Sequence, residues 1–435
     1  MSWVRRYQLR LYFRNAIWIF PALSMPFALL FASLLVGYEH SIGSQLNISA
    51  ETGRVVISMV AGSMFSLLVL VCSAVLVTVQ LASAQLTPRV ITVVYRDRYR
   101  KFALAFFVFT FTFSVAVLVR IDETVPRWST YLAGYGFLLN LVLFILFIDS
   151  IGKTLRPSSV LRIVALRGRN VIRAVYPSAL TKDSLLAGPI KALDDEESRV
   201  VLSTVDGALL AFDLKGLVAI AERANCLIEL VPEVGQFIAA GDPLFRISKG
   251  GEHLSESQLR NSVAVEAERT LEQDPLFAFR IIVDIANKAL SPAVNDPTTA
   301  VLAIDQIHHL LRDVGKRYLA EGRETDRGGQ LRLMYRTPNW EDFVLLGTTE
   351  IRQYGADSIQ VQRRLRAMLK DLIETLPERR MPVLQNELAL LANMSKRAFP
   401  DLADQTLAES GDLQGIGGSY DDEMSEPGRM APVGS

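Results

Sequence analysis

The sequence has few cysteines and no net charge. Two cysteines in 435 residues exclude a disulfide framework and a cysteine-rich metal cluster. Cys72 and Cys226 lie in apolar or strand-like runs, which is typical of small buried hydrophobic residues. The 46 Lys and Arg balance 46 Asp and Glu, which argues against a nucleic-acid partner. A hydrophobic content of 50% excludes general disorder.

The sequence motifs of common enzymes are also missing. We find no P-loop, no GxGxxG after a strand, and no GxSxG, CxxC or HExxH segment. Asp305 and His309 are four residues apart on a predicted helix and would share one face, but no third metal ligand is evident. An ordinary helix-surface histidine is favoured, so we predict no cofactor and rank a metal-dependent enzyme third among the possible functions.

Long apolar runs fill the first third of the chain. The four runs are Ile17–Tyr38, Val55–Val79, Phe102–Val119 and Tyr131–Ile148. Each is close to the ~20 residues that a helix needs to cross about 30 Å of hydrocarbon. The first run is too long for a cleaved signal peptide, and three more runs follow it. The sequence therefore predicts a four-helix transmembrane domain over residues 1–151, with the lipid bilayer as its surroundings.

Basic residues flank alternate ends of these runs. Fifteen Lys or Arg lie before run one, between runs two and three, and after run four, against three in the other two loops. The positive-inside rule then places both termini in the cytoplasm. The net charge of zero therefore conceals a basic membrane region and an acidic end of the chain.

The second run contains small and polar residues at helical spacing. Small residues at four-residue intervals let helices approach closely in lipid, and glutamine is costly against lipid, so it should face protein or water. The candidates for helix packing or pore lining are Ser58, Gly62, Ser66, Thr78, Gln80, Ser83 and Gln85. Two interpretations remain: a helix packed at the centre of the bundle, and a pore-lining or oligomer-forming helix.

Residues 152–248 lead from the membrane into a mixed region. Residues 152–198 form a basic connector, which either lies against the inner leaflet or is simply the positively charged flank. Residues 199–248 alternate strand-like runs with turn signals and predict a small β-rich module. Its second half resembles the barrel-sandwich half-motif of biotinyl and lipoyl domains. The nearby Lys215 has a helix-like context, so we expect a structural or oligomerising barrel without an attached cofactor.

Residues 255–400 are mostly helical in pattern. Asp274-Pro275 and Asp296-Pro297 each place a capping residue before a proline at the first helical position. Candidates for a polar site surround both caps: Glu268, Arg269, Thr270, Asp274, Ser291, Asn295, Asp296 and Thr298. Caps and inter-helix hydrogen bonds would account for these residues without chemistry, and a ligand site is the alternative.

The last part of the chain is predicted from amphipathicity and composition. Residues 357–376 and 378–398 should form two amphipathic helices, with the arginines of the first as solvated charge. Residues 320–330 suggest a flexible loop. Residues 401–435 are rich in glycine, serine and acidic residues, which predicts a disordered acidic tail.

Three segments of the chain resemble a known family. They are Gln80-Leu81-Ala82-Ser83-Ala84-Gln85, Glu268-Arg269-Thr270 with Gln273-Asp274, and Leu290-Ser291-Pro292-Ala293-Val294-Asn295-Asp296-Pro297-Thr298-Thr299-Ala300. They look like a family of predicted bacterial membrane proteins classed as a domain of unknown function, over roughly residues 10–400. The resemblance implies a bacterial inner-membrane protein with four spans and a cytoplasmic domain, and it implies no established activity.

These observations favour an oligomeric inner-membrane protein with a channel-like pathway along the second run, controlled by its cytoplasmic domain. The alternative is a non-conducting, membrane-anchored sensor or regulatory scaffold. The partners expected are a second copy of the chain and an unidentified solute or regulatory ligand.

Overall fold

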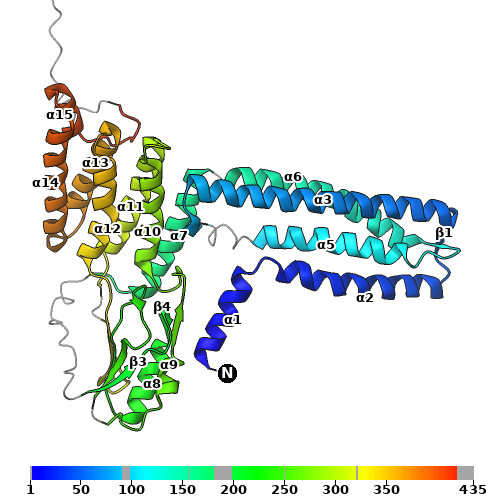
Figure 1. Cartoon of the computed structure of the whole chain (residues 1–435), viewed down its shortest axis with the longest axis horizontal. Helices are drawn as coiled ribbons and strands as arrows, with labels where there is room; N and C mark the ends of the chain where they lie inside the picture. Colours follow the sequence, from blue (N-terminus) through cyan, green and yellow to red (C-terminus); the bar gives the residue numbers. More distant parts are fainter. Residues whose placement is uncertain are drawn as a thin grey trace, which may run out of the picture. The chain divides into compact units, whose positions relative to one another are not determined.

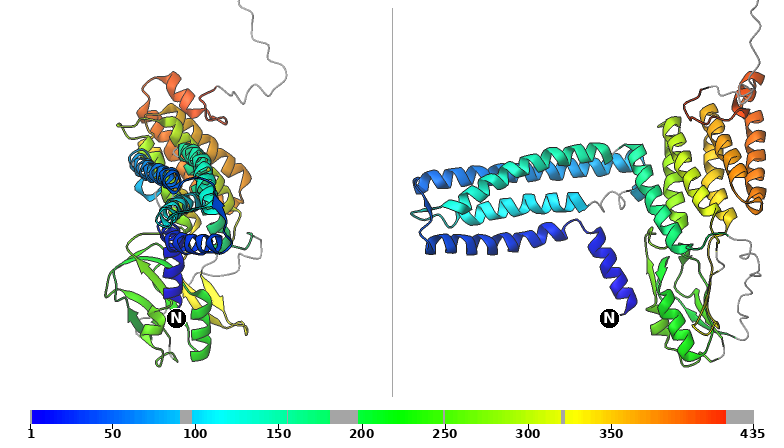
Figure 2. Two further views of the ribbon diagram at one scale, coloured as in Figure 1. Left: turned by 90° about the vertical axis from the view of Figure 1, so that its right-hand side faces the viewer. Right: turned by 180° about the vertical axis from the view of Figure 1, so that it is seen from behind.

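A computed structural model describes residues 2–90, 98–154, 156–180, 198–248, 250–319 and 322–418 (Figures 1 and 2). The chain divides into two compact units. The N-terminal unit comprises residues 9–160, and the C-terminal unit comprises residues 161–418 together with residues 2–8. The first turns of helix α1 (Trp3–Asn15) belong to the second of these units, where the Val4 N–H donates to the Asn261 carbonyl at 3.2 Å.

Four helices of the N-terminal unit are long and apolar enough to cross a membrane, which confirms that the four predicted runs form long apolar helices. They are α2 (Ile19–Ser41), α3 (Ala50–Gln85), α5 (Arg98–Leu118) and α6 (Arg127–Thr154). A 3-10 turn, η1 (Pro88–Val90), follows α3, and strands β1 (Gln45–Leu46) and β2 (Val125–Pro126) pair at the opposite end. At 1.5 Å per residue, the 36 residues of α3 extend for about 54 Å, which is longer than the hydrocarbon layer.

Helix α5, rather than α3, is at the centre of the N-terminal unit. It contacts α2, α3 and α6, and half of its apolar window is buried, against 22% for α3. Phe109 and Phe113 of α5 pack against the ring of Phe31 on α2. The buried side-chain amide of Asn140 on α6 donates to the buried Thr110 hydroxyl on α5 at 2.8 Å, which is an interhelical hydrogen bond. The interpretation of α3 as the central helix is therefore wrong for a single chain.

The C-terminal unit contains two separate sheets. The five-stranded sheet has the order β3-β7-β5-β10-β9, in which β5 and β10 are parallel, and the three-stranded sheet has the order β6-β4-β8. The strands are β3 (Arg199–Leu202), β4 (Gly207–Phe212), β5 (Ile228–Leu230), β6 (Phe237–Ile238), β7 (Pro243–Ile247), β8 (Val263–Glu266), β9 (Arg323–Thr325) and β10 (Leu331–Tyr335). These strands do not close into a barrel within the residues that the structure describes.

Helices make up the rest of the C-terminal unit. They are α7 (Pro157–Val175), α8 (Leu214–Ala224), α9 (Glu256–Arg260), α10 (Pro275–Ala289), α11 (Pro297–Gly315), α12 (Trp340–Tyr354), α13 (Ile359–Thr375), the 3-10 turn η4 (Glu378–Arg380), α14 (Met381–Ala398) and α15 (Leu402–Glu409). Asp274 and Asp296 cap α10 and α11 as predicted, each accepting a backbone N–H three residues on at 3.0 Å. Lys215 lies in α8, as its context suggested.

The basic connector contains an amphipathic helix packed on protein. Within the C-terminal unit, Leu161, Val164 and Ile172 of α7 are fully buried. Arg169 and Arg173 on α7 both pair with Asp313 of α11, at 3.3 and 3.5 Å. The apolar face of this helix is therefore buried on protein, and at Gly168 the helix lies close to Ala278 of α10 and Leu310 of α11.

The segment after α14 differs from the predicted disordered tail as far as residue 418. Asp412, which is 1% exposed, accepts the N–H groups of Gln414, Gly415 and Gly417. Three arginines of α13 hold this segment by donating to its carbonyl oxygens: Arg363 to Gly417 and Gly418, Arg364 to Asp412 and Leu413, and Arg366 to Ala408. These arginines are thus not solvated charge. The remainder of the predicted tail, residues 419–435, lies outside the described residues.

Candidate functional site

One face of α3 is exposed along most of the helix. Opposite it, Ile57, Ala61 and Met64 are buried against the other helices of the N-terminal unit. The exposed face includes Ser58, Gly62, Ser66, Ser73 and Gln80. A Cβ added to Gly62 would meet no heavy atom within 4 Å, so the four-helix unit does not itself require a glycine there.

The serines of this face have their hydroxyl groups satisfied by the helix. Ser58, Ser66 and Ser73 donate to backbone carbonyls three or four residues earlier, at 2.8, 3.1 and 2.9 Å. Such bonds let a serine lie against lipid or another helix without an unpaired donor. Of the other candidates, Thr78 is buried and points inward, Ser83 is half-buried, and the side chain of Gln85 lies outside the described part.

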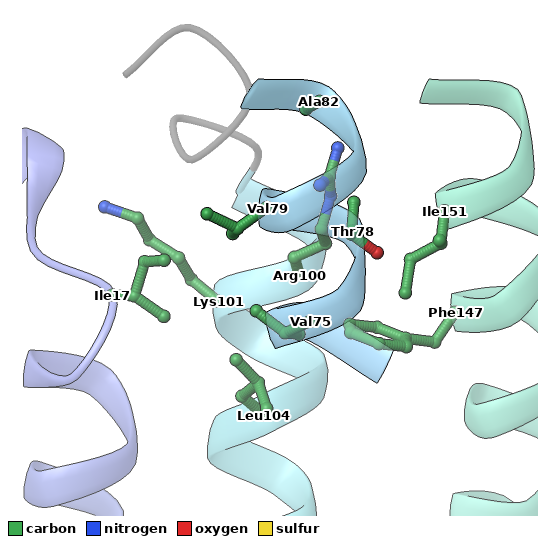
Figure 3. A pocket seen from close by; sticks show the side chains of 10 residues that line it. All are labelled: Ile17, Val75, Thr78, Val79, Ala82, Arg100, Lys101, Leu104, Phe147 and Ile151. Atoms are coloured by element: carbon green, nitrogen blue, oxygen red, sulfur yellow. The ribbon is translucent and has the colours of Figure 1, made fainter. Parts of the chain in front are cut away.

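A pocket lies where one end of each span meets the others (Figure 3). It lies between the last turns of α3, the first turns of α5, the last turns of α6 and the residue Ile17 before α2. Its empty volume is about 520 Å³, which includes the open solvent at its mouth, so it is a shallow recess and not an enclosed cavity. Most of its wall is aliphatic or aromatic: Ile17, Val75, Val79, Leu104, Phe147 and Ile151.

Two basic side chains complete the wall of this pocket. Arg100 and Lys101 extend in different directions from the first turns of α5 (Figure 3). Lys101 is only 5% exposed, and its ammonium group donates to the Arg14 carbonyl at 2.7 Å. In the sequence both residues contribute only to the count of basic residues that predicts topology.

A polar cluster surrounds the start of α10. Arg269 donates two hydrogen bonds to one carboxylate oxygen of Asp274, at 2.9 and 2.7 Å, and its guanidinium lies 5.6 Å from the centre of the Phe277 ring. Burial raises the pKa of Asp274, while Arg269 opposes the shift. Thr270 has a buried hydroxyl without a hydrogen-bond partner, whereas Glu268 is exposed and outside the cluster. A cap and an ion pair account for most of this arrangement.

Glu233 adds a further acid to this cluster, and no motif or spacing in the sequence marks this residue. Burial raises its pKa to about 6, with further contributions from the negative charges of Asp342 and Asp274. Its Oε1 atom is buried without a hydrogen-bond partner. The residue lies in the β5–β6 loop next to Gly235, where an added Cβ would lie 2.0 Å from the Arg269 guanidinium. Glycine therefore lets this loop approach the ion pair closely.

The other predicted polar candidates, residues 291–298, lie beyond the C-terminal end of α10. Asn295 has a left-handed backbone (φ 49°), and Asp296 accepts from both the N–H and the hydroxyl of Thr299, not from Thr298, which is exposed. Ser291 donates to the Lys288 carbonyl at 2.7 Å. The fifteen residues of α10 separate the two segments by about 22 Å, so they do not form one site.

The weak metal candidates are not assembled into a ligand set. Asp305 pairs with Arg364 at 2.6 Å, and His309 is exposed. The neighbouring His308 instead contacts Asp371 at 2.7 Å. Among the described ranges, no group of three or more His, Cys, Asp or Glu side chains is suited to a metal ion.

The four candidate spans and the mixed α/β unit that follows them define the class of this chain as a membrane protein. Comparison with known sequences gives the family. Residues 14–371 match the family described as "Predicted membrane protein (DUF2254)", and the chain belongs to it. This confirms the resemblance seen in the sequence.

Similar proteins of the family are known from mycobacteria. The uncharacterised protein Rv1290c of Mycobacterium tuberculosis and the uncharacterised protein Mb1321c of Mycobacterium bovis are each 25% identical to this chain. Each match covers 97% of this chain and 83% of the relative. No solved structure matches the chain.

Proposed function

We propose that the protein is a self-associating protein of the bacterial inner membrane, in which the exposed face of α3 meets the same face of other copies and lines a channel-like pathway. Both termini are cytoplasmic in this proposal, and the C-terminal unit controls the pathway. The observation that supports it is the exposed row of Ser58, Gly62, Ser66, Ser73 and Gln80, opposite the face of α3 that is packed within the unit.

Gly62 offers a test of self-association. Because nothing lies within 4 Å of an added Cβ, Gly62→Leu should leave the fold of one chain intact while keeping two α3 helices apart. Gly37 of α2 is also exposed with open space around it, so Gly37→Leu is the matched control. We expect Gly62→Leu to lower the oligomer mass in detergent or nanodiscs and Gly37→Leu to leave it unchanged. Equal masses for all three proteins would exclude association through α3.

Cysteine labelling tests whether water follows this face. In a Cys72→Ser background, Ser66→Cys and Ser73→Cys should react with a membrane-impermeant thiol reagent. Val142→Cys on the exposed side of α6 is the control and should not react. Inaccessibility of both α3 positions would exclude the pathway. Gln80 is less informative, because it lies beyond the apolar run and meets water in either case.

A non-conducting, membrane-anchored scaffold is the second candidate. The hydroxyl groups of Ser58, Ser66 and Ser73 favour it, because each is satisfied within α3 and none requires water. In this case the C-terminal unit binds a regulatory ligand or protein. Association that depends on Gly62, together with unreactive cysteines and no solute flux in liposomes, would select this function over the channel.

A further inference from the structure

The second half of helix α1 is exposed, although it precedes the first span directly. The first half is held by the C-terminal unit, where the Gln8 amide donates to the Glu266 carboxylate at 2.8 Å. The second half has Leu9, Tyr12 and Phe13 on its surface, at 42, 53 and 56% exposure. None of the thirteen residues of α1, all of which the structure describes, is buried. A helix of this length is marginal in water without packing, so α1 needs a surface outside the chain to cover its exposed half.

The exposed surface of α1 is also strongly basic. Its four arginines are all exposed: Arg5, Arg6, Arg10 and Arg14. No Asp or Glu precedes Glu39 in the sequence. Three of the arginines follow one another at four-residue intervals and form one row, and like charges at this spacing destabilise a helix. Leu9 and Phe13 form the adjacent row, about 100° around the helix. The surface that covers α1 therefore has to combine negative charge with apolar groups.

The end of α1 is fixed where the spans leave the hydrocarbon. Three residues separate α1 from α2, and the Lys101 ammonium group donates to the carbonyl of Arg14, in the last turn of α1, at 2.7 Å. Lys101 directly precedes the third apolar run, so this bond places the last turn of α1 at the boundary of the bilayer. Residues 9–15 belong to the same unit as α2, and they leave α2 at a steep angle instead of continuing along its axis (Figures 1 and 2). A helix with this anchor and direction runs along the membrane surface.

We propose that α1 lies in the interface of the bilayer, with the side chains of Leu9, Tyr12 and Phe13 among the acyl chains and its arginines beside the phosphates of anionic lipids. Basic helices with aromatic residues and leucine bind membrane surfaces in this way, and guanidinium binds phosphate through paired hydrogen bonds. Trp18 supports the same depth, because it is 58% exposed and its ring lies 6.4 Å from that of Tyr12. Tryptophan and tyrosine are enriched at the boundary between lipid and water. This assignment does not depend on whether α3 lines a pathway.

The test uses the full chain in nanodiscs of phosphatidylcholine with an increasing fraction of anionic phosphatidylglycerol. A nitroxide label is attached to Leu9→Cys in a Cys72→Ser background, in which Cys226, 3% exposed, stays unlabelled in the folded chain. Collisions with oxygen report hydrocarbon, and collisions with a water-soluble nickel chelate report water. The variants of this labelled chain are Arg10→Gln, Arg10→Lys and Phe13→Ser. Arg127→Gln is the matched control, because Arg127 is an exposed arginine beside an exposed tryptophan at the opposite end of the spans.

We expect the label to collide more often with oxygen than with the chelate, and this preference to grow with the fraction of phosphatidylglycerol. Arg10→Gln should lower the ratio of lipid-bound to water-exposed label roughly fivefold, as expected when a basic residue is removed from an anionic lipid surface. Arg10→Lys should keep most of the ratio, Phe13→Ser should lower it without a change of charge, and Arg127→Gln should leave it unchanged.

Three results would overturn the proposal. The first is a label that the chelate reaches equally in both lipid compositions. The second is a label that neither reagent reaches, which would place α1 against protein. The third is an equal loss in Arg10→Gln and Arg127→Gln. Because no residue of α1 is buried, the variants should keep the melting temperature, and the comparison of lipid compositions tests the proposal in the labelled chain even without them.

Discussion

The crossing of α7 and α10 is closer than two alanines would allow. Gly168 of α7 faces Ala278 of α10, and a Cβ added to Gly168 would lie 2.5 Å from the Ala278 Cβ. Non-bonded carbon atoms pack at about 3.5–4.0 Å, so Gly168→Ala must push the helices apart or strain both. We predict that Gly168→Ala destabilises the C-terminal unit and that Ala278→Gly restores its stability in the same chain.

The magnitude follows from two opposing effects. Overpacking of a filled core costs about 1–3 kcal/mol, and a shortfall of about 1 Å between carbon atoms places this contact toward the upper end. Alanine in place of a helical glycine stabilises by about 1 kcal/mol, so the net loss for Gly168→Ala is about 1–2 kcal/mol. Ala278→Gly alone should cost about 1 kcal/mol of helix propensity. In the double variant the two Cβ atoms no longer clash, and the helix propensity that α7 gains at residue 168 equals the helix propensity that α10 loses at residue 278. Its stability should therefore lie within about 0.5 kcal/mol of the original, a coupling of about 2 kcal/mol.

The two cysteines of the chain supply the assay. Cys226 is 3% exposed in the core of the C-terminal unit, whereas Cys72 is exposed on α3. In a Cys72→Ser background, labelling of Cys226 over a urea series in detergent reports the free energy of unfolding of the C-terminal unit. If the effects of the two single substitutions simply add, or if Gly168→Ala leaves the urea midpoint unchanged, the close crossing of α7 and α10 is refuted.

Three further predictions concern buried charge. Because the pKa of Glu233 is raised to about 6, the protonated side chain stabilises the fold fully below pH 4.5, and this stabilisation is lost as the pH rises through 6. Glu233→Gln should remove about 1 kcal/mol of this pH dependence of the unfolding free energy in urea titrations, a value discounted for partial exposure. Identical pH profiles of the variant and the original chain would contradict this prediction. Arg352→Ala leaves the carboxylate of Glu387, 1% exposed, without its partner and should cost about 3–5 kcal/mol, whereas Arg352→Met with Glu387→Leu should recover most of this loss at the urea midpoint. Asp412→Ala removes the acceptor of three backbone N–H groups, so limited proteolysis should cut residues 410–418 faster than in the original chain, with unchanged cutting elsewhere.

Local chemistry in the sequence identified many of the helices. The caps Asp274 and Asp296 are each followed by a proline, and both helices begin where that pattern predicts. The four spans were evident for a similar reason, since length and apolarity alone decide whether a helix can cross the bilayer. The position of α5 at the centre of its unit was not evident, because apolar residues cover every side of each span. The buried hydrogen bond between Asn140 and Thr110 identifies the faces of α5 and α6 that point inward, but neither residue reveals this until its partner is known.

The periodicity of the sequence does not show which distant strands pair with each other. Residues 331–335 lie in a region predicted as helical, yet they form β10, which pairs in parallel with residues 228–230 of β5, about a hundred positions earlier. The apolar stripe of α7 has the same period whether it covers lipid or protein, so the sequence of α7 alone does not decide between the two. The segment from 402 to 418 was misjudged because its composition was averaged with the residues after it. Its hydrogen bonds join arginines to backbone carbonyls, an acceptor that every residue possesses and that no sequence pattern reveals.

The basic residues near the span ends count equally in the positive-inside rule, but they differ in how far they are buried. A basic residue that sets topology must only remain on one side of the membrane, so its side chain need not be buried. Lys153 is such a residue, because its side chain is 67% exposed and pairs with Asp149. Lys101 has the same charge at the same end of the spans, yet it is 5% exposed and lines a pocket. Removing an ammonium group from water costs several kcal/mol unless nearby groups compensate it. The Arg14 carbonyl supplies one hydrogen bond toward that compensation, at 2.7 Å. A charge count therefore gives Lys101 and Lys153 the same role, although one ammonium group is buried among the span ends and the other meets water.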